Sequence, residues 1–110
     1  MVARSAVETM TTSSAGDPHA NQPVLIAGTP LERARVAVVL LHGRGASAAS
    51  ILDLAPALAA EGVACLAPQA GGSTWYPFPF LRPLADNEPG ISSAMAAIDR
   101  VLARTGAAGI

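Results

Sequence analysis

One stretch of the sequence decides the fold: Val38-Val39-Leu40-Leu41-His42-Gly43-Arg44-Gly45-Ala46-Ser47. It completes an apolar run, residues 36–41, that does not alternate between apolar and polar side chains. Strands buried on both faces have this pattern, and they belong to parallel sheets covered by helices. The turn that follows, residues 42–45, is named the glycine turn here, because its two glycines allow the backbone to bring bare N–H groups close to a ligand. Ligands of open α/β sheets bind at such carboxyl ends of strands.

Strands and helices alternate on both sides of this stretch. Residues 24–27 form a short apolar run, and residues 63–67 predict a second buried strand. Between the strands, helical spacing predicts a helix capped by Ser50, kinked or split by Pro56 and stopped by Gly62. This alternation predicts an α/β fold with a mostly parallel sheet flanked by helices.

The rest of the chain contains a long loop and a second helix. Residues 69–89, named the aromatic loop here, contain all four aromatic residues of the chain, and long loops in compact domains are usually functional. Residues 90–105 predict a helix capped by Gly106, and Ile110 is expected to open a further strand. An apolar stripe on this helix, interpreted as ordinary helix core, consists of Ile91, Ala94, Met95, Ile98, Val101 and Leu102.

Composition narrows the class of protein. The 110 residues are 51% hydrophobic and 14% charged, which argues against global disorder. We expect residues 1–22 to form a flexible tail and residues 23–110 a single domain. The seven basic residues are scattered arginines, so no nucleic-acid partner is expected, and no run of about 18 apolar residues predicts a membrane span.

The single cysteine and the acidic residues give no sign of a metal or cofactor. Cys65 has no partner for an intramolecular disulfide and is interpreted as a small core residue, which favours a reducing, cytoplasmic location. No group of His, Cys, Asp and Glu has metal-ligand spacing. We therefore expect neither a metal nor a cofactor.

The glycine turn resembles the His-Gly-x-Gly loop of the phospholipase/carboxylesterase family, which includes acyl-protein thioesterases and is related to dienelactone hydrolases. Three further motifs resemble a bacterial branch of that family: Ala67-Pro68, Trp75-Tyr76-Pro77 and Asn87-Glu88-Pro89-Gly90. The combination, at this spacing, is more specific than any one motif. The resemblance extends over about residues 24–110.

The resemblance implies a serine α/β-hydrolase that cleaves a small carboxylic ester or thioester. The backbone N–H of Arg44 would be one oxyanion donor, and His42, Gly43 and Gly45 would shape the turn. Trp75 and Tyr76 would lie at the mouth of the acyl pocket.

The sequence departs from the family where the catalytic residues should follow. The family continues with a strand and Gly-x-Ser-x-Gly just after the position of Ile110, then an Asp and a His, and these 110 residues contain no such serine motif. We therefore expect an N-terminal part of the hydrolase, with no catalytic residue in this chain and no activity alone. The alternative is a non-catalytic interaction fragment or truncated gene product that self-associates through an unpaired strand edge.

Other interpretations of the same residues remain open. His42 suits structural hydrogen bonds in the turn better than a general base, and Ser47 and Ser50 suit helix capping better than nucleophilic attack. The aromatic residues could wall a pocket or merely cover the sheet edge. A phosphate-binding role for the turn is disfavoured, because Ala48 replaces the third glycine of the dinucleotide fingerprint and no acidic residue follows the second strand.

Overall fold

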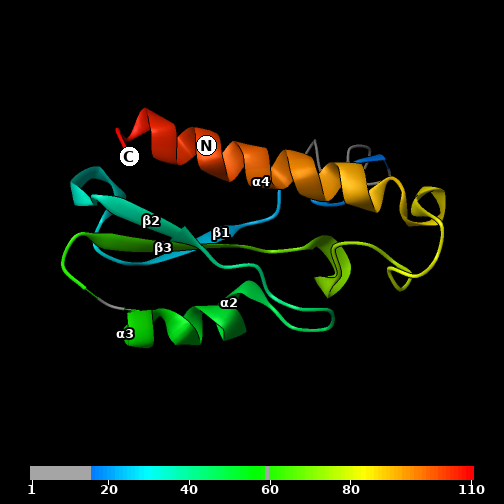
Figure 1. Ribbon diagram of the computed structural model, residues 1–110, viewed down its shortest axis with the longest axis horizontal. Coiled ribbons are helices and arrows are strands. Elements are labelled where there is room, and N and C mark those ends of the chain that lie inside the picture. Colours follow the sequence, from blue (N-terminus) through cyan, green and yellow to red (C-terminus); the bar gives the residue numbers. More distant parts are fainter. Residues whose placement is uncertain (1–15, 59) are drawn as a thin grey trace.

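A computed structural model describes residues 16–58 and 60–110. Figure 1 shows a three-stranded sheet between two layers of helix. The strands are β1 (Val24–Gly28), β2 (Val36–Val39) and β3 (Val63–Pro68), in the spatial order β1-β3-β2. The short helices α2 (Ala48–Ile51) and α3 (Ala55–Leu58) lie on one side, and the long helix α4 (Gly90–Ala107) lies on the other. The expected α/β layering is therefore present.

The sheet is mixed, whereas the sequence predicts a mostly parallel one. β2 runs parallel to β3, because the helical segment between them returns the chain to the end of the sheet at which β2 began. β1 runs antiparallel to β3, with Val24 opposite Pro68 and Gly28 opposite Ala64. The short connection from β1 to β2, residues 29–35, reverses the direction of the chain without a crossover helix.

The centre of the sheet carries the core. β3 has a strand on each side and helices on both faces, and its residues from Ala64 to Pro68 are all buried. β2 lies at the edge, so the prediction that residues 36–41 are buried on both faces is wrong at both ends of that run. Val36 is 51% exposed and Leu41 is 45% exposed.

Local signals set the helices that follow β2. Ser47 is the N-cap of α2 and exchanges hydrogen bonds with Ser50, so the helix begins before the predicted cap at Ser50. The helical segment is split at a 3-10 turn, Leu52–Leu54, which precedes Pro56. Proline lacks the N–H of a helical residue and clashes with the carbonyl group four positions earlier, which here belongs to Leu52.

Helix α4 packs on the sheet through small residues, which differs from the predicted core stripe. Its buried residues are Gly90, Ser93, Ala97, Val101 and Thr105. Only Val101 belongs to the predicted stripe, whereas Met95 is 57% exposed and Leu102 is 51% exposed. Small side chains allow the axis of α4 to lie close to β3. The larger apolar side chains lie on a neighbouring face of the helix.

The two ends of the domain also differ from expectation. α4 continues past the predicted Gly106 cap to Ala107, and Gly109 has the positive φ of 87° that ends such a helix. Ile110 bonds back to Thr105 and is not in a strand. Residues 1–15 of the expected tail lie outside the described residues, while His19 packs against the domain with only 3% of its surface exposed.

Candidate functional site

The glycine turn lies at the carboxyl end of β2 and is tied to the aromatic loop on both sides. The N–H of Gly45, which has a positive φ of 79°, donates to the Ser73 carbonyl oxygen at 2.8 Å. The Arg44 guanidinium donates to the carbonyl oxygens of Pro77 and Phe78 at 3.0 and 3.1 Å. Its charge also lies 5.4 Å from the centre of the Tyr76 ring. These contacts fix the backbone of the turn relative to the loop.

The backbone N–H of Arg44 makes no hydrogen bond to any of the described residues. Its neighbour in the turn, Ala46, donates to the Gly43 carbonyl oxygen at 3.1 Å, so the turn is closed around this group. An N–H that the turn does not use internally can donate to a ligand.

His42 is buried and makes two hydrogen bonds with backbone groups. The N–H of Ala70 donates to Nε2 at 3.0 Å, which requires an unprotonated Nε2. Nδ1 then carries the proton and donates to the Gly43 carbonyl oxygen at 2.8 Å. The lone pair on Nε2 is the one with which the neutral ring can accept a proton. Because it accepts from the Ala70 N–H, His42 cannot take a proton from a serine unless that bond breaks.

Trp75 links the turn to the rest of the loop. Its indole Nε1–H donates to the His42 carbonyl oxygen at 2.9 Å, and the two rings are 5.2 Å apart. Thr74 supports the same segment, since its hydroxyl donates to the Tyr76 carbonyl oxygen at 2.7 Å. Trp75 and Tyr76 are therefore held half-buried next to the turn.

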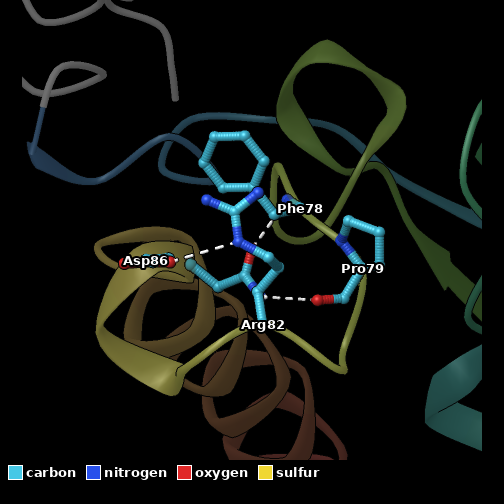
Figure 2. Close-up of polar contacts among 5 residues, drawn as sticks. Phe78, Pro79, Arg82 and Asp86 are labelled. Carbon is cyan, nitrogen blue, oxygen red and sulfur yellow. Dashed lines mark hydrogen bonds and ion pairs between the residues drawn. The ribbon is translucent and has the colours of Figure 1, made fainter.

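The tip of the aromatic loop is held by a second set of contacts, shown in Figure 2. The Arg82 guanidinium stacks 4.5 Å from the Phe78 ring centre and pairs with the Asp86 carboxylate at 3.3 Å. The backbone N–H of Arg82 donates to the Pro79 carbonyl oxygen at 3.0 Å. These contacts hold the tip of the loop in one compact conformation.

An apolar cavity of about 400 Å³ opens between this loop and α4. It begins at Leu41, one residue before the glycine turn, and Trp75 and Tyr76 form part of its wall. Arg82 is the charged residue among its described lining. The other lining residues are Phe80, Leu84, Asn87, Ile91, Ala94, Met95 and Ile98. An apolar hollow with a few polar groups is typical of a site for a small apolar ligand.

Comparison with solved structures gives a match over most of the chain. The chain is 42% identical to a phospholipase/carboxylesterase from Dyadobacter fermentans DSM 18053, with a TM-score of 0.77 over 81% of this chain. The resemblance to phospholipase/carboxylesterases is confirmed. The chain spans 43% of the length of that phospholipase/carboxylesterase. No family model and no curated protein matches the sequence.

The structure brings together the residues that the sequence predicts for a phospholipase/carboxylesterase site. His42 contacts Trp75, and Arg44 contacts Tyr76. A Cβ atom on Gly43 or on Gly45 would meet open space, and the N–H of Gly45 bonds to the Ser73 carbonyl oxygen. The Arg44 side chain is turned toward the loop carbonyl groups and is not part of the cavity lining.

Several residues of the site were missed by sequence reasoning. The apolar stripe of α4 was assigned to the core, although Ile91, Ala94, Met95 and Ile98 line the cavity. The stripe itself was a signal, because a helix that packs through its small residues leaves its larger apolar residues for another surface. The Asn87 motif was noted without a role, and His19 was placed in the tail, where no local pattern marks its contacts.

The candidate nucleophiles have other partners. The hydroxyl groups of Ser47 and Ser50 both bond to backbone groups at the N-terminus of α2, where the two residues cap the helix. In the described part of the chain, no group of three or more His, Cys, Asp or Glu side chains could hold a metal ion. No described helix is long and apolar enough to cross a membrane.

Proposed function

We propose that this chain supplies the oxyanion-binding turn and the acyl-binding cavity of a serine hydrolase that cleaves carboxylic esters or thioesters. The observation that carries the proposal is the backbone N–H of Arg44, which bonds to none of the described residues and lies in the turn after β2, beside an apolar cavity. The match to a phospholipase/carboxylesterase supports the same reaction class.

The role of the turn follows from the charge that develops during ester cleavage. When a serine hydroxyl attacks the carbonyl carbon, the carbonyl oxygen becomes an oxyanion, and a general base takes the hydroxyl proton. The N–H of Arg44 would donate to that oxyanion. One such donor contributes about 2.7–4 kcal/mol of transition-state stabilisation.

The Arg44 side chain would act on the same donor indirectly, as a positioning group. Its two hydrogen bonds to the aromatic loop, with the Gly45–Ser73 bond on the other side, hold the turn in place before substrate arrives. Donors that need no reorganisation during the reaction are the most effective. The acyl chain would lie in the cavity, in contact with Trp75, Tyr76 and the flank of α4.

These 110 residues would bind an acyl group without turning over an ester. The sequence contains no Gly-x-Ser-x-Gly motif, and the lone pairs of both His19 and His42 accept backbone hydrogen bonds. Ester cleavage of this class would require a serine nucleophile and a general base in addition to the groups described. A cytoplasmic location stays a prediction, as in the sequence analysis.

A binding and turnover experiment tests the proposal. We expect decanoate to change the fluorescence of the single tryptophan, Trp75, in a saturable way. Ala94→Phe, which fills the cavity, should weaken this binding at least tenfold, whereas Ala103→Phe on the exposed side of α4 should not. We expect no hydrolysis of p-nitrophenyl butyrate and no labelling by a fluorophosphonate probe. Absence of saturable decanoate binding would refute the acyl-site proposal, and a labelled serine would refute the inactivity.

The exposed surface favours a second candidate function, a non-catalytic interaction fragment. β2 has a strand on one side only, and Val36 at its start is half exposed. The loop tip exposes Phe80, Leu81 and Leu84 at 78%, 84% and 68% of their surface. We expect self-association that rises with concentration in size-exclusion chromatography. A monomer that elutes unchanged over a hundredfold concentration range would rule this candidate out.

A further inference from the structure

The segment that precedes β1 is clamped between the start of the aromatic loop and α4. The backbone N–H of His19 donates to the Ser93 hydroxyl oxygen at 3.0 Å, and the Ser93 hydroxyl donates to the Asp17 carboxylate. Arg100 of α4 donates to the His19 carbonyl oxygen at 3.4 Å. The imidazole of His19 is thereby carried into the interior, where 3% of the residue is exposed.

The aromatic loop is shaped to receive this segment. A Cβ atom on Gly71 would overlap the carbonyl oxygen of Pro18, so the close approach requires glycine at position 71. The N–H of Gly71 donates to Nδ1 of His19 at 3.0 Å, and Nε2 therefore carries the proton. Nε2 donates to the carbonyl oxygen of Trp75 at 2.8 Å.

Two imidazole groups from distant parts of the chain consequently lie next to Trp75. The His19 ring lies 5.0 Å from the Trp75 ring, and the His42 ring lies 5.2 Å from it. The two imidazoles accept hydrogen bonds from consecutive backbone N–H groups, those of Ala70 and Gly71. Both histidines therefore contact Trp75, which forms part of the cavity wall, and only His42 belongs to the glycine turn.

We infer that His19 is a positioning residue that sets Trp75 against the acyl-binding cavity through its Nε2–H bond to the Trp75 carbonyl oxygen. The inference rests on the proposed function, since it assigns the acyl affinity of the same cavity partly to residue 19. If His19 only anchored the segment before β1, its substitution would change stability without changing how Trp75 contacts a ligand.

Two conservative substitutions separate these roles. In His19→Gln the side-chain amide reaches the place of Nε2 and keeps a donor for Trp75, whereas in His19→Asn the shorter amide occupies the place of Nδ1 and keeps only the Gly71 bond. We expect His19→Asn to bind decanoate about tenfold more weakly than wild type, with a shifted Trp75 emission maximum. His19→Gln should remain within about threefold of wild type.

Gly71→Ala tests the inference with the histidine intact, because the added Cβ displaces Pro18 and the residue that follows it. We expect the same weakening as in His19→Asn. Gly16→Ala is the control, since a Cβ there meets open space. If His19→Asn does not fold, Gly71→Ala against Gly16→Ala decides the question.

The outcomes also separate this inference from the proposed function. Wild-type affinity and unchanged Trp75 emission in both His19→Asn and Gly71→Ala would overturn the positioning role. If wild type itself does not bind decanoate, the proposed function fails, and the Trp75 emission of the same variants still shows whether His19 positions the indole.

Discussion

The side-chain oxygen Oδ1 of Asn87 lies 2.6 Å from the backbone nitrogen of Phe78, which donates to it. Its amide nitrogen donates to the Pro79 carbonyl oxygen at 3.4 Å, and only 1% of the residue is exposed. The Asn87 side chain therefore bonds to the backbone of the loop tip in the way that a neighbouring strand would. It also lines the acyl-binding cavity, so the loop fold and the cavity share one residue.

Asn87→Ala should destabilise the domain by about 1–3 kcal/mol, because it removes a buried amide that accepts from the N–H of Phe78 and donates to the Pro79 carbonyl oxygen. Urea denaturation followed by circular dichroism measures this change in the free energy of unfolding. Asp99→Asn, an exposed change on α4, is the control and should alter stability by less than about 0.5 kcal/mol. Equal stability of the two variants would contradict the role of Asn87.

Two glycines of α4 should respond oppositely to the same substitution. A Cβ on Gly90 would lie 2.9 Å from the Trp75 carbonyl oxygen and 3.1 Å from the Tyr76 Cα, so Gly90→Ala must shift the loop. A Cβ on Gly106 meets nothing within 4 Å, and alanine there should stabilise the helix by up to about 1 kcal/mol. Thermal unfolding of both variants checks the signs. A Gly90→Ala protein as stable as wild type would contradict this prediction, because the aromatic loop would then move at no cost in free energy.

Arg44→Lys should loosen the aromatic loop while leaving the backbone N–H of residue 44 in the chain. A lysine cannot reproduce the planar fork that bonds to Pro77 and Phe78 together. We expect faster hydrogen exchange of the backbone amides in residues 77–82, measured by mass spectrometry, and unchanged exchange in β3. Uniformly faster exchange would instead indicate a global loss of stability.

Glu88 should make stability depend on pH. The backbone N–H of Ser92 and then its hydroxyl donate to the Glu88 carboxylate, and these bonds lower its pKa from the ordinary 4.5. The carboxylate thus stabilises the fold above the ordinary pKa, and this contribution is lost as the pH falls through the lowered value.

A pair of variants measures the Glu88 effect. Wild type should melt higher than Glu88→Gln at neutral pH, and the difference should vanish in acid. In Ser92→Ala an NMR titration should show the Glu88 pKa closer to its ordinary value but still lowered, because the backbone bond, the larger cause, remains. A difference in melting temperature that grows in acid would contradict the assignment.

Much of the fold follows from local patterns in the sequence. The apolar runs before the glycine turn and before Pro68 predict β2 and β3, and Pro56 predicts the split between α2 and α3. The antiparallel pairing of β1 does not follow, because a short apolar run carries no information about its partner. The α4 stripe shows that the helix is amphipathic, but periodicity alone does not tell a core from a cavity wall.

The candidate site also contains residues that the sequence predicts and residues that it does not. The glycine turn and Trp75 can be proposed as site residues from the sequence because their residues form a motif. His19 cannot, because its bonds join side-chain atoms to backbone groups 52 and 56 positions away. A backbone N–H or carbonyl group can make such a bond whatever side chain its residue carries. The sequence therefore shows no pattern at these positions, except at Gly71, where the close approach of Pro18 requires glycine.

The order β1-β3-β2 also constrains how the polypeptide acquires its shape during synthesis. β1 and β2 do not pair with each other, and both take their partners from β3, residues 63–68. Neither can pair with β3 until β3 has left the ribosome, so β1 and β2 are open to pairing with other nascent chains for all of that time. A translational pause ahead of residue 63 would therefore prolong the interval in which the chain is most prone to misassembly.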